Sequence, residues 1–459
     1  MQSASQQTPF PKILILGAGP TGLGAAYRLL QLNYPNWKIV ERNPYPGGLA
    51  ASFKDSAGFT WDIGTHVPCS HYAEFDQFFN EMTQGDVFEH QKRGYIRLSD
   101  RFIPFPLQSN IRHLPPDIFQ ECYHDLEKVA HRQTSPDRSN FLTWNRERFG
   151  DGITRYFIQP DNEKRWAFPL HKLASDWLAD RVSPVDLDRI RENIRLGQNN
   201  AFWRLYNSFQ YPKRGGIGSV FEGMRSRLGV RLELEREVVE IESATRAVWF
   251  SDDQYENCDY LLSTLPINKL VQMLTGVPES LLATANQLES SDAYIVGIGL
   301  RGSINSDKHW AYCPESVAPF YRATYLTNFS PFNGPDANHS SILCDISHSR
   351  YLMRDKDSIV QETIDGLIAT GMLQPEDTSR IVSTYLIDVP GVNPLPTLER
   401  DGILDMLHGY LEPLGIHSRG RQGAWLYEVG NMDHCVMMGM QWVDAILAGK
   451  RETVWLDRR

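Results

Sequence analysis

Arginines and tyrosines stand close together at two places in the second half of the chain. Trp310 and Tyr312 precede Arg322 in a region with strand character, and Arg421 lies six residues before Tyr427. The chain is acidic overall, with a formal net charge of -10, so an anionic ligand has to be met by local arginines. Guanidiniums and phenolic hydroxyls are the groups that a diphosphate site requires. Each arginine taken singly fits a surface ion pair equally well.

A glycine-rich turn near the start of the chain predicts a dinucleotide site. Gly17, Gly19 and Gly22 lie between the apolar run 13–16 and a helix-like stretch at 23–32, a pattern typical of a strand, a tight turn and a helix. The unpaired N–H groups at the start of such a helix favour a pyrophosphate. The alternative interpretation is that small residues merely close the turn and bind nothing.

The residues that follow this turn indicate FAD. The next apolar strand, at 37–40, ends in Glu41, whose carboxylate is suited to accept a ribose hydroxyl. Gly47 and Gly48, with Leu49 beside them, let the backbone approach a bulky ligand closely. That arrangement suits a flavin that stays bound better than a nicotinamide that comes and goes.

The bulk properties exclude several classes of function. The acidic composition argues against nucleic acid or an anionic membrane as partner. No apolar run reaches the ~18 residues that cross a bilayer, and residues 1–11 lack the apolar region of a signal peptide, so we expect a cytoplasmic protein. The six cysteines are scattered, and His66 and His71 have poor spacing for a helical metal pair. We therefore expect no metal site.

The order of sequence patterns predicts an α/β protein with a Rossmann-like FAD-binding domain, an inserted helical domain and an antiparallel β-sheet domain. The FAD-binding domain is assigned to residues 1–90, about 205–265 and 405–459, and it includes Gly430 and Asn431 ahead of an apolar helix at 436–447. Apolar residues at helical spacing assign about 107–204 to a helical substrate domain, with examples at Phe119, Tyr123, Leu126 and Val129. Residues at about 91–106 and 266–404, with strands expected at 293–300 and 341–346, form the sheet domain.

Beyond these local patterns, the chain resembles the FAD-dependent UDP-galactopyranose mutases, specifically their eukaryotic-type branch. The resemblance covers nearly the whole chain in ordered blocks: residues 61–67, 70–72, 104–108, 160–162, 166–167, 180–182, 207, 211–212, 215–216, 320–324, 328–331, 396–400, 418–421, 427–431 and 433–434.

The resemblance implies an isomerase that interconverts the pyranose and furanose forms of a nucleotide sugar, UDP-galactose or a related one. Reduced FAD attacks the anomeric carbon through N5 with no net redox change, and NAD(P)H is a candidate reductant. Two alternatives stay open. One is an FAD-dependent oxidase or dehydrogenase of the amine-oxidase or protoporphyrinogen-oxidase type, and the other is an inactive protein that binds flavin and nucleotide sugar. The oligomeric state is not indicated.

The resemblance also implies roles for single residues. Arg322 and Arg421 hold the diphosphate with Tyr312 and Tyr427. The sugar or the diphosphate is assigned to Arg181, Asn207 and Trp310. The nucleoside is assigned to Gln108, Asn162 and Trp166. The flavin is assigned to Gly64, His66, Gly430 and Asn431. His66, Arg181, Arg322 and Arg421 are the candidate catalytic residues. A hydrogen-bonded turn residue is the simpler alternative for His66.

Three positions depart from the family pattern. Thr65 stands where a glycine is usual, which narrows the backbone conformations open to the loop. Phe105 replaces a tyrosine near the uridine, and Asn393 replaces a further tyrosine at the diphosphate. Because these changes lie at the nucleotide end, the resemblance leaves the identity of the sugar and of the nucleoside diphosphate open.

Overall fold

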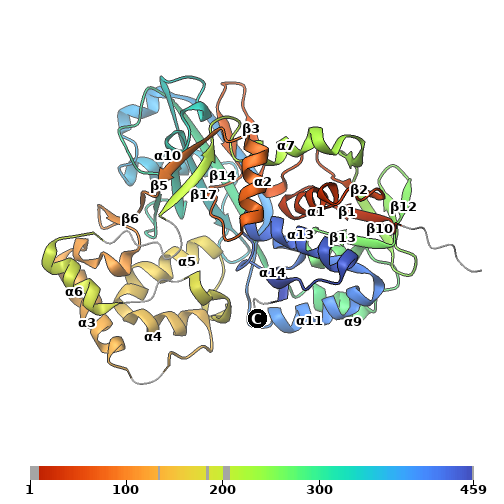
Figure 1. Cartoon of the computed structure of the whole chain (residues 1–459). Helices are drawn as coiled ribbons and strands as arrows, with labels where there is room; N and C mark the ends of the chain where they lie inside the picture. The colour runs from red at the N-terminus through yellow and green to blue at the C-terminus, as the bar shows by residue number, and fades with distance from the viewer. Residues whose placement is uncertain (1–9, 133–134, 182–185, 200–206, 457–459) are drawn as a thin grey trace, which may run out of the picture.

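The computed structural model describes residues 10–132, 135–181, 186–199 and 207–456 (Figure 1). A parallel five-stranded sheet forms one part of the protein, in the order β19 (Ile416–Ser418), β13 (Tyr260–Ser263), β1 (Ile13–Leu16), β2 (Trp37–Val40) and β9 (Leu232–Glu233). All four residues of β1 are buried, as the apolar run at 13–16 predicts for a central parallel strand.

Two helices from opposite ends of the chain cross closely on this sheet. They are α1 (Pro20–Gln31), which follows β1, and α13 (Met432–Ala448). The crossing depends on glycine, because a Cβ on Gly439 would lie 2.0 Å from the carbonyl oxygen of Thr21, and one on Gly24 would lie 2.2 Å from that of Val436. The C-terminal helix thereby returns to the first βαβ unit, although more than 400 residues separate them in sequence.

A helical part contains α3 (Pro116–Ala130), α4 (Phe141–Ile153), α5 (Gln159–Trp166) and α6 (Leu187–Leu196). In Figure 1 these helices gather at the lower left, away from the parallel sheet. The predicted apolar positions lie on α3, where Leu126 is buried and the rings of Phe119 and Tyr123 stack at 5.7 Å. This packing joins α3 to the separate hydrophobic cluster of the helical part.

A seven-stranded sheet forms the third part, with the strand order β18-β14-β17-β16-β15-β6-β7. The strands are β18 (Ile381–Pro394), β14 (Ser290–Arg301), β17 (His339–His348), β16 (Arg322–Tyr325), β15 (Trp310–Tyr312), β6 (Gly94–Leu98) and β7 (Arg101–Pro104). The expected antiparallel sheet is mixed, because β6 pairs with β15 in parallel. This pair joins segments about 215 residues apart, so no local pattern indicates its direction.

Smaller elements connect these parts. They are β3 (Ser52–Lys54), β4 (Thr60–Asp62), α2 (Ala73–Thr83), β5 (Val87–Gln91), β8 (Ser208–Pro212), α7 (Gly218–Leu228), β10 (Val238–Glu242), β11 (Ala247–Phe250), β12 (Tyr255–Asn257), α8 (Ile267–Met273), α9 (Glu279–Ala285), α10 (Ile359–Ala369), α11 (Arg400–Leu411), α12 (Gly420–Gly423) and α14 (Thr453–Leu456). Among the described residues, no helix is both long enough and apolar enough to cross a membrane.

Candidate functional site

The two predicted glycine loops touch each other through their backbones. The N–H of Gly47 donates to the carbonyl of Ala18 at 2.8 Å, and a Cβ on Gly48 would come within 3.2 Å of the Gly19 Cα. A Cβ on Gly22 would lie only 2.0 Å from the Gly17 carbonyl oxygen. Side chains at these positions would therefore fill or distort a cradle that the bare backbone leaves for a ligand.

The start of α1 and the carboxylate of Glu41 face this cradle with groups that fit FAD. Gly19 caps α1 without a side-chain hydrogen bond, and no acidic residue lies in the first turn, so the helix N-terminus is suited to an anion such as the pyrophosphate. Glu41 is buried and accepts hydrogen bonds from the Ala18 N–H at 2.9 Å and from Asn43. A carboxylate has about four acceptor positions, so Glu41 retains capacity for a ribose hydroxyl.

The loop that carries His66 is held in a defined conformation. Gly64 has φ +78°, and its carbonyl accepts a hydrogen bond from His66 Nδ1 at 3.1 Å. Desolvation lowers the pKa of His66 more than the nearby Asp62 carboxylate raises it. The neutral ring therefore carries its proton on Nδ1, which leaves Nε2 as an acceptor.

Sheet register brings the predicted diphosphate residues together. Tyr312 of β15 lies opposite Arg322 of β16, which in turn lies opposite Asp345 of β17. Arg322 donates from Nε to Asp345 Oδ2 at 2.9 Å and from a terminal nitrogen to the carbonyl of Thr65 at 3.3 Å. Burial disfavours the charge of Arg322, but Asp345 and the adjacent tyrosines outweigh this effect, so the pKa of Arg322 lies above its usual value.

A second group of residues surrounds Arg421. Its guanidinium donates to Asn393 Oδ1 at 3.1 Å and to the carbonyl of Val392 at 3.2 Å, and it lies 4.7 Å from the centre of the Tyr427 ring. A Cβ on Gly430 would lie 3.1 Å from a terminal nitrogen of Arg421. Asn393, at the position where the family resemblance leads us to expect a tyrosine, is therefore in direct contact with the arginine.

The predicted nucleoside residues lie on the helical side of this group. Trp166 of α5 donates from Nε1 to Asn162 Oδ1 at 3.0 Å, and its ring meets Tyr427 edge-on at 4.6 Å. Phe105 lies 5.4 Å from Tyr312, ring to ring. Gln108 is also buried, with 9% of its surface exposed.

For the other predicted residues, the contacts described here are with other parts of the chain. Asn207 is exposed, and its carbonyl accepts the Lys92 N–H at 2.7 Å. The indole of Trp310 packs against Gly94, where a Cβ would lie 2.8 Å from the ring. Asn431 caps α13. Arg181 ends a 3-10 helix at Asp176–Arg181, but its side chain and residue 182 lie outside the described part of the chain.

Two features of the site are missed by sequence reasoning. Asp345 accepts hydrogen bonds from Thr65, through the Thr65 N–H at 3.3 Å and Oγ1 at 3.0 Å, besides its contact with Arg322. Thr65 Oγ1 also contacts the hydroxyl of Thr324. Asp345 thereby links the His66 loop to Arg322. The second missed residue is Arg165, which lies 5.0 Å from the centre of the Tyr312 ring.

A cluster of possible metal ligands lies at the other end of the loop. His71, Asp433 and His434 place ligand atoms within 4.8 Å of one another. Sequence spacing gives no sign of it, because 362 positions separate His71 from Asp433. Asp433 Oδ2 accepts hydrogen bonds from both the ring and the N–H of His71, at 2.6 and 3.2 Å. We interpret the cluster as a hydrogen-bonded anchor between the loop and the start of α13.

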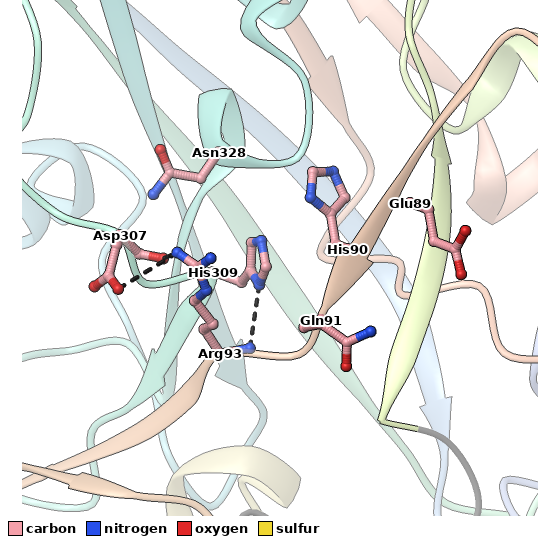
Figure 2. Close-up of a pocket in the computed structure, with 7 residues that line it drawn as sticks. All are labelled: Glu89, His90, Gln91, Arg93, Asp307, His309 and Asn328. Carbon is pink, nitrogen blue, oxygen red and sulfur yellow. Dashed lines mark hydrogen bonds and ion pairs between the residues drawn. The ribbon is translucent and has the colours of Figure 1, made fainter.

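A separate pocket of about 410 Å³ opens beside the end of β5 (Figure 2). None of the residues that line it is among those predicted for cofactor or substrate: Glu89, His90, Gln91, Arg93, Asp307, His309 and Asn328. Figure 2 shows the His309 ring above the main chain of Arg93, whose N–H donates to His309 Nδ1 at 3.1 Å. Burial, the neighbouring His90 and the charge of Arg93 lower the pKa of His309 to about 3.

We expect His309 to make the protein less stable in mild acid. Its pKa of about 3 in the folded state lies below the usual 6.5, so the unfolded chain binds this proton first as the pH falls. The stabilisation is complete above about pH 6.5 and is lost progressively toward pH 3. Melting temperatures at neutral pH and at about pH 5 should therefore differ less in His309→Asn, whose amide oxygen can replace Nδ1 as acceptor. An equal difference in both proteins would contradict the prediction.

The comparisons with known proteins first define the class. The family model described as flavin containing amine oxidoreductase matches residues 20–382. The fold is also shared by a putative protoporphyrinogen oxidase from an Exiguobacterium species, with a TM-score of 0.72, 16% identity and coverage of 97% of this chain and 100% of that chain. Putrescine oxidase bound to putrescine gives a TM-score of 0.65 at 17% identity, over 96% of this chain and 100% of that chain. These oxidases share the fold at low identity.

A crystal structure of reduced UDP-galactopyranose mutase is much more similar. It superposes with a TM-score of 0.95 and 35% identity, over 98% of this chain and 97% of that chain. The chain therefore belongs to the UDP-galactopyranose mutase family within the flavin-containing amine oxidoreductases. By this membership it is a flavin-dependent isomerase with FAD, in its reduced form, as cofactor. The predicted family, fold class and cofactor are confirmed.

Proposed function

We propose that the protein interconverts the pyranose and furanose forms of a nucleotide sugar, UDP-galactose or a close relative, in the cytoplasm and with NAD(P)H as a candidate reductant. The observation that carries this proposal is that Arg322 lies opposite Tyr312 in the sheet and that Arg421 stacks on Tyr427. An oxidase that acts on a neutral or amine substrate has no use for two arginines directed at a diphosphate. We also propose that the chain is divided into an FAD-binding domain, a helical substrate domain and a sheet domain, at the boundaries predicted from the sequence.

In this proposal the protein binds the sugar and the diphosphate of the substrate at separate places while the bond between them is broken. Reduced FAD, held by the two glycine loops, Leu49 and Glu41, supplies a nucleophilic nitrogen for the anomeric carbon. Arg322 and Arg421 neutralise the diphosphate as it leaves, and the hydroxyls of Tyr312 and Tyr427 donate to its oxygens. Holding the leaving group within the site keeps its return effectively intramolecular.

The other predicted residues position the substrate. Asn162, Trp166, Gln108 and Phe105 bind the nucleoside by packing and hydrogen bonding, while Asn393 takes the place of a tyrosine beside Arg421. We assign Asn207 and Trp310 to the sugar or the diphosphate, and Arg181 to the same part of the substrate from the family resemblance alone. His66, with Gly64, Gly430 and Asn431, lies against the flavin, where the free Nε2 acceptor of its neutral ring is available to a donor.

The proposal is tested by incubating the purified, dithionite-reduced flavoprotein with a panel of nucleotide sugars. We expect one of them to give a furanose product, detected by chromatography and NMR. The oxidised protein is the matched control, and it should give no product. Failure to isomerise any member of the panel, together with hydrogen peroxide formation from an amine in air, would overturn the proposal in favour of an oxidase.

A further inference from the structure

A third guanidinium, that of Arg165, lies beside the proposed diphosphate site. Arg165 is on α5 between Asn162 and Trp166. Residues three and four apart share one face of a helix, so Arg165 faces the same way as Asn162, three positions before it. The residues on this face meet Tyr312, Tyr321 and Tyr427.

Arg165 and Arg322 contact the same tyrosine ring. The guanidinium carbon of Arg165 lies 5.0 Å from the ring centre of Tyr312 and 4.9 Å from that of Tyr321. Arg322 lies 5.7 Å from the same Tyr321 ring. Guanidiniums stack on aromatic rings at such distances and still present their N–H groups along their edges. Arg165 is thus close to the residues that meet the leaving group in the proposed reaction.

Asp161 holds Arg165 in this orientation. It accepts hydrogen bonds from Arg165 Nε at 3.3 Å and from a terminal nitrogen at 2.9 Å, and 4% of its side chain is exposed. The Arg165 side chain is more open, at 21%. These bonds use two of the five N–H groups of a guanidinium. Burial opposes the charge of Arg165, but Asp161 and the surrounding tyrosines raise its pKa above the usual value.

We propose that Arg165 binds the diphosphate of the substrate as a third cation beside Arg322 and Arg421, with Asp161 as its positioning residue. The inference rests on the proposed function and extends it to specificity. Asn393 leaves this chain without one tyrosine hydroxyl at the diphosphate, and Arg165 supplies donors from α5. The site should therefore select ligands with two phosphates over those with one phosphate or none.

The test compares the dissociation constants of UDP, UMP and uridine in the FAD-loaded protein, measured by calorimetry or competition. Arg165→Met keeps an unbranched apolar chain over the tyrosine rings but removes the charge. We expect its UDP dissociation constant to rise tenfold or more, while that of uridine stays within twofold. Arg165→Lys should recover part of the loss, since it restores charge without the planar fork.

Arg155→Met is the matched control. Arg155 also stacks on a tyrosine, Tyr156, at 4.6 Å and pairs with a carboxylate, Glu121, but 61% of its side chain is exposed. It should bind all three ligands as the wild type does. The proposal is overturned if Arg165→Met binds UDP within twofold of the wild type, or if UDP and uridine weaken together, which would indicate a structural role.

The same data separate this inference from the proposed reaction. The wild type could isomerise no nucleotide sugar while Arg165→Met selectively loses affinity for UDP. That result would reject the proposed reaction and support the assignment of Arg165 to the diphosphate. A wild-type protein that neither binds UDP nor isomerises any nucleotide sugar of the panel would overturn both.

Discussion

Arg322→Ala should reduce kcat/KM for the nucleotide sugar by a factor of about 30 to several thousand. The variant removes a partly buried guanidinium that contacts the buried Asp345 and the Thr65 carbonyl and that we assign to the diphosphate. Loss of one partner of a buried, hydrogen-bonded charge pair costs about 2–5 kcal/mol, and each 1.4 kcal/mol is a factor of ten. Steady-state kinetics of the reduced enzyme measure this effect.

Two further variants identify the cause of that loss. Arg322→Lys keeps the charge but cannot reach Asp345 and the ligand with the same planar fork, so its kcat/KM should fall between those of the wild type and Arg322→Ala. Arg301→Ala, at the exposed end of β14 in the same sheet, should leave kcat/KM unchanged. A normal rate for Arg322→Ala would remove this arginine from the site.

The features of the fold that sequence predicts best are those set by neighbouring residues. The strand, glycine turn and helix at 13–31 depend on the apolar run of β1, on Gly17 and on Gly22, all of which are close in sequence. The segments expected as strands at 293–300 and 341–346 are the interiors of β14 and β17, since their buried apolar residues are continuous. Apolar residues at helical spacing likewise predict α3.

Contacts between distant segments escape the same reasoning. Asp345 lies in an apolar strand, where a lone carboxylate gives no sign that it bonds Thr65, 280 positions earlier. Arg165 follows a charged helix turn and is typical of a surface residue until the fold places Tyr312 and Tyr321 over it. The family resemblance assigns Tyr312, Tyr427 and Arg322 to the site, but the residues that orient them depend on how this chain packs.

Thr65 illustrates how a departure from the family pattern is accommodated. The structure keeps the left-handed conformation at Gly64, where φ is +78°, and a Cβ there would lie 2.9 Å from Asp345 Oδ1. Thr65 itself uses its side chain and N–H to bond Asp345. The added side chain therefore ties the His66 loop to the β16–β17 pair, and it does so without a strained backbone at Thr65.

Gly22→Ala should yield a protein that purifies with little or no FAD. An added Cβ would lie 2.0 Å from the carbonyl oxygen of Gly17 and 3.2 Å from Ile15 Cγ2, so the turn has to shift. Overpacking of this kind costs about 1–3 kcal/mol, which corresponds to an affinity weaker by a factor of about 5 to about 150 if the shifted turn is the one that binds FAD. The ratio of flavin absorbance to protein concentration after gel filtration measures the loss.

The matched control is Gly409→Ala, because Gly409 lies within α11 and an added Cβ there would meet nothing within 4 Å. This variant should keep its full complement of FAD and gain slightly in melting temperature, since alanine favours a helix over glycine by about 1 kcal/mol. Full FAD content in Gly22→Ala would show that the turn tolerates the shift and that the cofactor does not depend on the close approach of Gly22 to Gly17. A loss of FAD in both variants would instead indicate that flavin binding follows global stability, and the glycine turn would then have no special part in it.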